Sequence, residues 1–390
     1  MTALLSLLFW LSAIALFWTY FGYPLLMAVR AKVRARPIQQ DESYLPSITL
    51  LIPAYNEADV IREKLENALS LDYPAGKLQI IVVDDGSADG TTEIVREFEE
   101  RGVTLIRQPE RSGKMAAVNR GFEAATGELV VLSDASPIYE TNALRLLARN
   151  FADPSVGVVV GALRVWDAQN AVAKPAGLYW QYESALRRWE SLTGSTVAVH
   201  GNMFAVRRNL YRPLRRHTIN DEFSIAMEVM RQGYRVVYEP HAISYDMASA
   251  TMSDEFKRRA RINAGRFQAL FSAGYLKAPT LDLTFRLISH KLLRPLTPIF
   301  MLTALVSSFM LMILTAFSFD RAFWFWLLVF FAQDVFYMLA YAGYLAERNG
   351  RSNKFLSVPY FFVSSNLAAL VGMWRWLRNR QSVTWQKRTS

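Results

Sequence analysis

Long apolar stretches occupy the two ends of this 390-residue chain, and shorter apolar segments alternate with polar ones between them. Residues 3–28 carry no charged side chain, and about 20 apolar residues are enough to cross the hydrocarbon core of a membrane. Residues 298–319 and 322–345 form two more such stretches, separated by a short turn. We therefore predict three transmembrane helices. A cleaved signal peptide is the alternative for the first stretch, but no basic region precedes it and it is too long.

A fourth apolar stretch, residues 355–374, is predicted not to cross the membrane fully, although its length would allow a crossing. Pro359 and the polar residues 364–366 interrupt it. A complete crossing would also place the basic C-terminal residues outside, against the tendency of Lys and Arg to stay on the cytoplasmic side. We therefore expect a bent, re-entrant or interfacial helix that is shielded by protein.

A strand, a helix and a second strand are predicted at the start of the central region, followed by a carboxylate-rich turn. Residues 49–53 and 78–83 are short and apolar on both faces, as parallel strands covered by helices on each side must be. Asn56 is expected to cap the intervening helix. The second strand ends on Asp84 and Asp85, and ligands of open parallel sheets bind at the carboxyl ends of the strands. The turn is therefore predicted to line a nucleotide pocket, although two aspartates there also serve as ordinary turn and cap residues.

The rest of the central region continues this alternation and predicts an α/β domain with a mostly parallel sheet. No glycine-rich phosphate loop follows the first strand, so a dinucleotide-binding Rossmann domain is a weak interpretation. Further strands are expected at residues 103–107, 128–134, 156–165, 197–205 and 234–239. Further helices are expected at residues 111–125, 179–192, 223–232 and 256–270.

Composition and charge support a membrane protein whose α/β domain faces the cytoplasm. Hydrophobic residues make up 52% of the chain, which is high for a soluble protein. The absence of cysteine excludes disulfides, a thiolate metal site and a cysteine nucleophile. The net charge of +10 could suggest nucleic acid, but the basic residues gather beside apolar segments, as at a membrane surface. Because the first basic cluster directly follows the first apolar stretch, we place the N-terminus outside and the next domain in the cytoplasm. The clusters are Arg30, Lys32, Arg34 and Arg36, and Arg375, Arg378 and Arg380.

These patterns divide the chain into five regions. They are a transmembrane helix, 1–29; a basic and polar linker, 30–46; the α/β domain, 47–252; amphipathic interfacial helices, 253–297; and a C-terminal membrane region with a basic tail, 298–390.

The opening unit closely resembles the start of family 2 glycosyltransferases, which are inverting enzymes that use nucleotide sugars on a GT-A fold. The likeness is carried by Pro53-Ala54-Tyr55-Asn56-Glu57 and by Val83-Asp84-Asp85-Gly86-Ser87-Ala88-Asp89-Gly90-Thr91. It implies that Asp84 accepts a hydrogen bond from the base of a uracil-type nucleotide. Lys114 and Asn119 match the family's Gly-Lys-x-x-Ala-x-Asn element, which lines the nucleotide. The implied nucleotide-binding residues of these segments are Pro53, Tyr55, Glu57, Asp84, Asp85, Lys114 and Asn119.

Asp134, at the end of the predicted strand 128–134, falls at the first position of the family's Asp-x-Asp motif and is the implied ligand of Mg²⁺ or Mn²⁺. A divalent cation that bridges a diphosphate usually takes one or two carboxylates. This chain has Ser136 where the second aspartate belongs. Three alternatives follow. Asp134 holds the metal with waters and phosphate oxygens, which we favour, or Ser136 adds its hydroxyl, or metal dependence is weakened.

The resemblance also implies that the catalytic base is one member of the acidic pair Asp221 and Glu222. Counted back from Gly233, Glu222 falls where the family usually has its base aspartate, so we lean toward Glu222. The alternative is a helix N-terminus with acidic residues in its first turn, which the helix dipole favours in any case.

Residues 197–205 resemble the family strand that lies under the sugar and the acceptor. His200, Gly201 and Asn202 are therefore candidate substrate contacts. Gly201 would permit a close approach of the backbone. His200 is open between a core histidine and a polar contact to substrate.

Two further motifs carry basic residues. The family's Gln-x-x-Arg-Trp motif falls on Arg258, Arg261 and Ile262, so its first and last letters are changed. The resemblance implies that Arg258 and Arg261 contact the diphosphate, whereas no stacking platform is expected at Ile262. A basic helix facing water or lipid headgroups is the alternative. Trp385 and Arg388 resemble the Trp-x-x-Arg element that related synthases hold near the active site.

By this resemblance the chain is an inverting glycosyltransferase, and a single displacement would turn an α-linked donor sugar into a β-linked product. The leading interpretation is synthesis of a polysaccharide from a UDP-sugar at the cytoplasmic face of the cell membrane, similar to the cellulose, hyaluronan and poly-N-acetylglucosamine synthases. Single transfer to a lipid-linked acceptor is the alternative, and a catalytically silent binding or scaffold protein is a minor one. Expected partners are the donor, the acceptor and membrane lipids but no nucleic acid, with a second copy of the chain or other export or synthesis subunits left open.

Overall fold

The computed structural model describes residues 1–166, 173–247, 251–351 and 354–380. Its strands are β1 (Ile48–Ala54), β2 (Leu78–Asp84), β3 (Val103–Arg107), β4 (Leu129–Leu132), β5 (Ile138–Tyr139), β6 (Val156–Trp166), β7 (Phe204–Arg207) and β8 (Arg235–Met247). Its α-helices are α1 (Thr2–Phe17), α2 (Tyr23–Val33), α3 (Ile61–Leu69), α4 (Thr91–Arg96), α5 (Lys114–Ala124), α6 (Ala143–Ala148), α7 (Ala173–Leu192), α8 (Asp221–Arg231), α9 (Met252–Phe267), α10 (Leu281–Arg286), α11 (Leu293–Thr315), α12 (Arg321–Arg348) and α13 (Lys354–Leu377).

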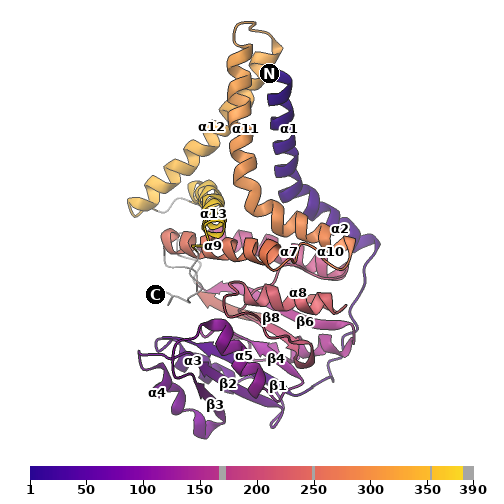
Figure 1. Cartoon of the computed structure of the whole chain (residues 1–390), viewed down its shortest axis with the longest axis vertical. Helices are drawn as coiled ribbons and strands as arrows, with labels where there is room; N and C mark the ends of the chain where they lie inside the picture. Colours follow the sequence, from indigo (N-terminus) through magenta and orange to yellow (C-terminus); the bar gives the residue numbers. More distant parts are fainter. Residues whose placement is uncertain (167–172, 248–250, 352–353, 381–390) are drawn as a thin grey trace.

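The elements form three layers along the long axis of the molecule (Figure 1). The α/β domain lies at one end, and α7, α9 and α10 lie across the side of it that faces the apolar helices. From this middle layer α1, α11 and α12 rise away from the domain. The chain therefore separates a sheet-based domain from a long apolar region.

One eight-stranded sheet in the order β3-β2-β1-β4-β7-β6-β8-β5 forms the domain. β1 pairs in parallel with β2 and β4, β2 with β3, and β6 with β8. β7 is antiparallel to β4 and β6, and β5 is antiparallel to β8. The prediction of a mostly parallel sheet is confirmed. Because β1, β2 and β4 are parallel neighbours, their carboxyl ends meet at one edge.

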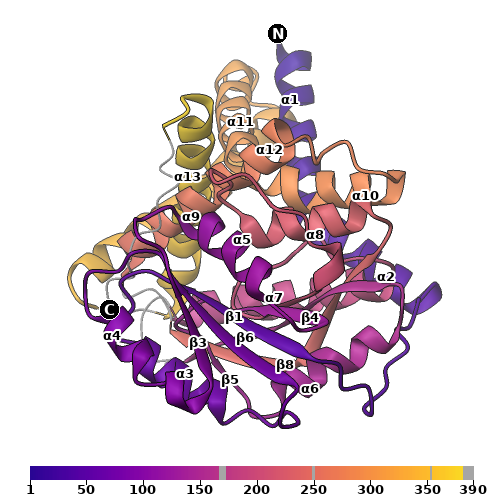
Figure 2. The same cartoon turned by 60° about the horizontal axis from the view of Figure 1, so that its bottom comes forward.

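Two hydrophobic clusters cover the two faces of the sheet, and β1 contributes alternate residues to each. Leu51 belongs to the cluster of Val118 in α5 and Met227 in α8. Leu50 belongs to the other cluster, with Leu65 in α3 and with residues of α6. Figure 2 shows α5 and α8 on one side of the sheet and α3 and α6 on the other. All seven residues of β1 are buried, as a strand covered on both faces requires.

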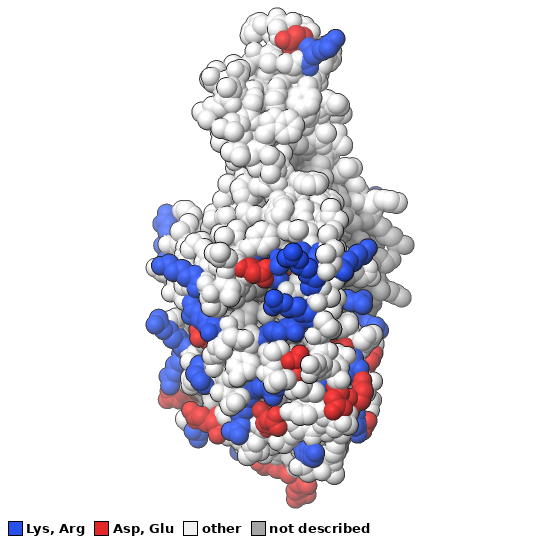
Figure 3. All heavy atoms as spheres, turned by 90° about the vertical axis from the view of Figure 1, so that its right-hand side faces the viewer, with Lys and Arg blue, Asp and Glu red and all other residues white. Residues whose placement is uncertain are grey.

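Within the residues that the structure describes, four helical segments are long and apolar enough to cross a membrane. Large apolar side chains lie exposed along them, such as Leu11, Leu302 and Leu328. In Figure 3 the charged side chains gather on the α/β domain and the middle layer, and the apolar region is almost uncharged up to its tip. The protein is therefore a membrane protein. The four segments are Thr2–Val33, Leu281–Thr315, Arg321–Arg348 and Phe355–Leu377.

α13 differs in direction from the other apolar helices. In Figure 1 it is seen nearly end-on beside α9, whereas α1 and α11 run along the long axis. Pro359 lies inside it and does not end it. At Gly372 the two helices approach closely, because an added Cβ there would lie 2.6 Å from the carbonyl oxygen of Ala260 in α9.

Two local predictions are wrong. Asn56 does not cap α3, because the N-cap of that helix is Val60. Asn56 instead has a backbone φ of +54°, and its side-chain oxygen accepts a hydrogen bond from the Ala88 N–H at 2.9 Å. Residues 197–203 are not part of a strand, since β7 begins only at Phe204. In both places the backbone serves contacts with distant segments rather than a regular element.

Candidate active site

The carboxyl end of β2 holds the two aspartates that follow the predicted pattern. Asp84 is fully buried, and its Oδ1 accepts from the Ser87 N–H at 3.0 Å while its Oδ2 accepts from the Thr92 hydroxyl. Between them Gly86 has φ +75° and lies against the backbone of Arg111, so the turn requires glycine. Asp84 therefore fixes the turn that leads into α4.

Asp85 fixes the segment before α5. Its two oxygens accept from the backbone N–H groups of Ser112 at 2.7 Å and Gly113 at 2.8 Å. Burial raises the pKa of this carboxyl, although these two hydrogen bonds act in the opposite direction. The contact places the first residue of α5, Lys114, at the same edge of the sheet.

The other predicted nucleotide contacts lie around this edge. Tyr55 follows β1, and the guanidinium of Arg111 lies 3.9 Å from the centre of its ring. The Glu57 N–H donates to the Thr91 hydroxyl at 2.9 Å, and Pro53 lies within β1. Asn119, in contrast, is held by the fold, since its amide donates to the Leu214 carbonyl at 3.1 Å and accepts from the Tyr211 hydroxyl.

Lys114 lies at the centre of a group of three carboxylates, which we call the acidic centre. Its Nζ is 2.8 Å from Asp134 Oδ1, 3.0 Å from Asp221 Oδ2 and 2.9 Å from Glu222 Oε1. Asp134 follows β4, and the acidic pair forms the first turn of α8. The structure thus brings together four predicted site residues that are up to 108 positions apart in the chain.

The two members of the acidic pair differ in their electrostatic surroundings. Burial and the neighbouring charge of Asp221 raise the pKa of Glu222 to about 8, against the effect of Lys114. Burial also opposes ionisation of Asp221, but the Lys114 ammonium and hydrogen bonds outweigh it and lower the pKa of Asp221. Of the two carboxyl groups, Glu222 therefore holds its proton more tightly and Asp221 ionises more readily.

Gly201 lets the Glu222 carboxylate pack directly against the backbone. An added Cβ at this position would lie 2.0 Å from Glu222 Oε1 and 3.3 Å from Asp134 Oδ2, so only glycine fits. The Gly201 carbonyl also accepts from the Asp134 N–H at 3.3 Å. Residues 197–203 depart from strand geometry at this contact, which explains why the strand prediction failed here.

The neighbours of Gly201 face different surroundings. The ring of His200 lies edge-on to Trp180, with 5.8 Å between ring centres, and burial lowers the pKa of this imidazole well below its usual range. The Asn202 amide donates to Asp246 Oδ2 at 2.8 Å. His200 is therefore a neutral histidine in an aromatic environment, and Asn202 positions a carboxylate from β8.

The residues around Asp134 fit a divalent cation with a diphosphate. Its side chain is 37% exposed, so a ligand can reach it. Mg²⁺ and Mn²⁺ are commonly held by one or two carboxylates with phosphate oxygens. Within the described parts of the chain, no group of three or more His, Cys, Asp or Glu side chains is arranged to hold a metal alone. Lys114 lies between the carboxylates that come closest to such a group.

α9 presses against the start of α8. An added Cβ at Gly265 would lie 2.6 Å from Asn220 Oδ1, and the Asn220 amide donates to the Ile262 carbonyl at 3.0 Å. Asn220 directly precedes the acidic pair.

The two arginines predicted to contact the diphosphate lie on α9. Arg258 donates two hydrogen bonds to the Glu255 carboxylate, at 2.9 and 3.0 Å, and Arg261 lies half-buried. Trp385 and Arg388 lie outside the described residues.

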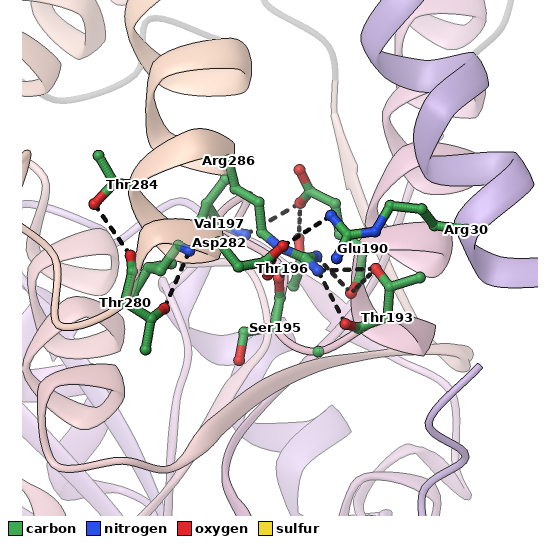
Figure 4. Close-up of polar contacts among 12 residues, drawn as sticks. Arg30, Glu190, Thr193, Ser195, Thr196, Val197, Thr280, Asp282, Thr284 and Arg286 are labelled. Atoms are coloured by element: carbon green, nitrogen blue, oxygen red, sulfur yellow. Dashed lines mark hydrogen bonds and ion pairs between the residues drawn. The ribbon is translucent and has the colours of Figure 1, made fainter. Parts of the chain in front are cut away.

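A second group of buried charges, which we call the interface cluster, joins α7 to the apolar helices. Glu190 accepts hydrogen bonds from Tyr23 at 2.5 Å and Thr196 at 2.8 Å, and lies 2.7 Å from His290 Nδ1. Arg286 donates to the carbonyls of Glu190 at 2.9 Å and Thr193 at 3.0 Å, as Figure 4 shows. Burial raises the pKa of Glu190, but the His290 charge and these hydrogen bonds prevail and lower it to about 2.

Asp246 and Lys64 are polar residues near the site that the sequence analysis missed. Asp246, on β8, accepts from the Ser136 hydroxyl at 3.1 Å. Lys64, on α3, is fully buried and donates to the Pro137 carbonyl at 2.6 Å. The sequence offered one signal for Asp246, because an aspartate near the end of an apolar strand is a candidate site residue. It offered none for Lys64, which has the pattern of an ordinary residue on a helix surface.

Comparison with known proteins agrees with this geometry. Residues 49–215 match the family described as Glycosyl transferase family 2. A poly-beta-1,6-N-acetyl-D-glucosamine synthase of Staphylococcus aureus (strain MSSA476) is 28% identical over 249 residues, which are 62% of this chain and 60% of that protein. The solved structure of the mannosyltransferase PcManGT from Pyrobaculum calidifontis, in complex with GDP-Man and Mn²⁺, superposes with a TM-score of 0.67 at 26% identity, over 92% of this chain and 99% of that one. Residues 49–215 therefore form a family 2 glycosyltransferase domain, and the domain has the GT-A fold.

Proposed function

We propose that this protein transfers a sugar, with inversion, from a UDP-sugar to a growing polysaccharide at the cytoplasmic face of the membrane and forms a β-linkage. The observation that supports this most directly is the acidic centre. It joins Lys114, the candidate metal ligand Asp134 and the pair Asp221–Glu222 at the edge where parallel strands end.

In this proposal Glu222 is the catalytic base. A carboxylate with a raised pKa is a stronger base than an ordinary one, and the Glu222 side chain is 14% exposed, so an acceptor hydroxyl can approach it. The acceptor hydroxyl loses its proton to Glu222 as its oxygen bonds to C1 of the sugar, and the bond from C1 to the nucleoside diphosphate breaks. One such displacement inverts the configuration. Asp221 stays ionised beside Lys114 and keeps Glu222 basic.

The donor is bound by the strand-end residues. Tyr55, Arg111 and the turn that Asp84 and Asp85 fix would hold the nucleotide. Asp134 would hold Mg²⁺ or Mn²⁺, which neutralises charge on the departing diphosphate. Arg258 and Arg261 remain candidates for contact with that diphosphate.

The test is nucleotide release from a panel of UDP-, GDP- and dTDP-sugars by the purified protein in lipid. We expect release with a UDP-sugar and a polymeric, β-linked product, and we expect neither with Glu222→Gln. Release from a GDP-sugar alone would show that the donor nucleotide is GDP and not UDP. The absence of release from every donor would favour the silent binding protein instead.

A second candidate is single transfer to a lipid-linked, anionic acceptor. It is favoured by basic groups on the side of the acidic centre that faces the apolar helices. Lys291 Nζ lies 5.3 Å from the ring centre of Phe223, the residue after Glu222. Arg187 is buried, and its Nη1 makes no hydrogen bond within the described part of the chain. In the same assay, a product of one sugar on an added polyprenyl phosphate would identify this reaction.

We also propose that the α/β domain and the C-terminus both face the cytoplasm. The basic residues 30–36 follow the first apolar helix, which supports an outside N-terminus. α13 runs across the long axis of the molecule, unlike α1 and α11, which supports an interfacial helix in place of a fourth crossing. We expect green fluorescent protein fused after Ser390 to fluoresce. An active alkaline phosphatase at the same position would place the tail outside and contradict this topology.

A further inference from the structure

Ser136 stands where the family's second aspartate belongs, and the structure shows what it contacts. Its hydroxyl donates to Asp246 Oδ1 at 3.1 Å, although the two residues are 110 positions apart. The pairing of β5 with β8 causes this contact. Ile138 lies opposite Tyr245 and Tyr139 opposite Ser244 in an antiparallel ladder, which carries Asp246 to the segment 136–137. A carboxylate from β8 therefore lies within hydrogen-bonding distance of the serine that replaces the missing one.

The other oxygen of Asp246 is also oriented. Oδ2 accepts from the Asn202 amide at 2.8 Å. Asn202 follows Gly201, whose added Cβ would lie 3.3 Å from Asp134 Oδ2. The Asp246 carboxylate is therefore fixed between two segments that both border Asp134, and it is 8% exposed.

Lys64 provides a separate sign that the two carboxylates share one region. Its ammonium donates to the Pro137 carbonyl at 2.6 Å and lies 3.9 Å from the ring centre of Tyr139. Burial lowers the pKa of Lys64 to about 7, and both Asp134 and Asp246 act electrostatically to raise it. The two aspartates therefore act on the same buried ammonium from different strands.

We propose that Asp246 supplies the second metal carboxylate that Ser136 lacks, so that Asp134 and Asp246 together hold the divalent cation of the donor, with Ser136 positioning Asp246. Two carboxylates with diphosphate oxygens are a usual ligand set for Mg²⁺ or Mn²⁺. Ser136 then acts through Asp246 and is not itself a ligand. The inference rests on the proposed use of a nucleotide sugar with a divalent cation.

The experiment measures Mn²⁺ binding rather than turnover. Mn²⁺ is titrated into the full-length protein in nanodiscs with UDP present, and free Mn²⁺ is followed by electron paramagnetic resonance. We expect Asp134→Asn and Asp246→Asn each to weaken Mn²⁺ binding at least about tenfold, the scale on which even the outer partners of metal ligands act. Glu140→Gln is the matched control, because Glu140 accepts from Tyr245, the neighbour of Asp246, at 2.8 Å. It should bind Mn²⁺ like the unmodified protein.

Moving the carboxylate from residue 246 to residue 136 distinguishes a loss of metal binding from a loss of folding. The double variant Ser136→Asp, Asp246→Asn should recover most of the lost Mn²⁺ affinity, because it returns the second carboxylate to the same place. Unchanged Mn²⁺ binding in Asp246→Asn, or no recovery in the double variant, would overturn the inference. Either result would leave the proposed function intact if the unmodified protein releases UDP from a UDP-sugar. A protein that binds Mn²⁺ as expected but releases no nucleotide would contradict the proposed function alone.

Discussion

The acidic centre and the interface cluster both bury charged side chains, but they balance their charges differently. In the acidic centre three carboxylates face one ammonium, and the pKa of Glu222 rises to about 8. In the interface cluster Glu183 and Glu190 face Arg286, Arg294 and His290, and the pKa of Glu190 falls to about 2. Carboxylates that share one ammonium compete for it, whereas carboxylates with their own basic partners stay ionised. We infer that the surplus of carboxylates marks the place for a substrate or a cation, and that the balanced cluster joins the domain to the membrane helices.

The substitution with the largest expected effect tests the surplus of carboxylates in the acidic centre. Glu222→Gln should lower the rate of transfer by about 10²–10⁴ while nucleotide binding stays intact, because it removes the proposed base. Asp221→Asn should retain more activity. The measurements are sugar transfer and UDP affinity on the same preparations. Activity near that of the unmodified protein in both variants would remove the pair from the mechanism.

The balanced cluster should instead control stability. Glu190→Gln should destabilise the protein by about 3–5 kcal/mol, because it leaves buried cationic partners without their carboxylate. Thermal unfolding in nanodiscs measures this. Glu66→Gln, which breaks an exposed ion pair with Arg101, is the control and should change the unfolding temperature little. Equal effects in the two variants would contradict a structural role for the cluster.

Loss of the metal carboxylate should have an intermediate effect. Asp134→Asn should weaken metal-dependent UDP binding by about tenfold or more. Ser136→Ala should cost less, because Asp246 still accepts hydrogen bonds from the Asn202 amide and the Met247 N–H. Calorimetric titration with and without EDTA distinguishes these cases. Full transfer activity in EDTA would show that no metal is needed.

The smallest expected effect is a shift along the pH axis. The base must be deprotonated, so kcat/KM should rise with pH up to about 8 and then level off, as the raised pKa of Glu222 requires. Removing the Asp221 charge should lower the pKa of Glu222 and move this rise to lower pH. Nucleotide release measured across pH 6–9, in the unmodified protein and in Asp221→Asn, checks the rise and its shift. Release without added acceptor is measured at each pH as the blank. A flat profile would mean that Glu222 does not act as the base.

Where a segment's own residues determine its structure, the sequence analysis was accurate. The strand predicted at residues 49–53 is β1, whose residues are all buried, because a parallel strand covered on both faces needs a continuous apolar run. Asn56 and residues 197–203 were misread because long-range contacts, with Ala88 and with Glu222, decide their backbone. The contact of Ser136 with Asp246 depends on how β5 pairs with β8, which no local pattern predicts.

Two glycine contacts lie in series between the apolar helices and the acidic pair. Gly372 seats α13 on α9, and Gly265 seats α9 on Asn220, the residue before Asp221. At Gly372 the nearest atom is a backbone oxygen of α9, and at Gly265 the short Asn220 side chain is held by its hydrogen bond to the Ile262 carbonyl. Well-packed protein transmits strain, so we expect a change in bilayer thickness or lateral pressure that moves α13 to shift the acidic pair as well. Turnover in detergent micelles and turnover in a bilayer should then differ, and lipid chain length becomes a variable of the reaction itself.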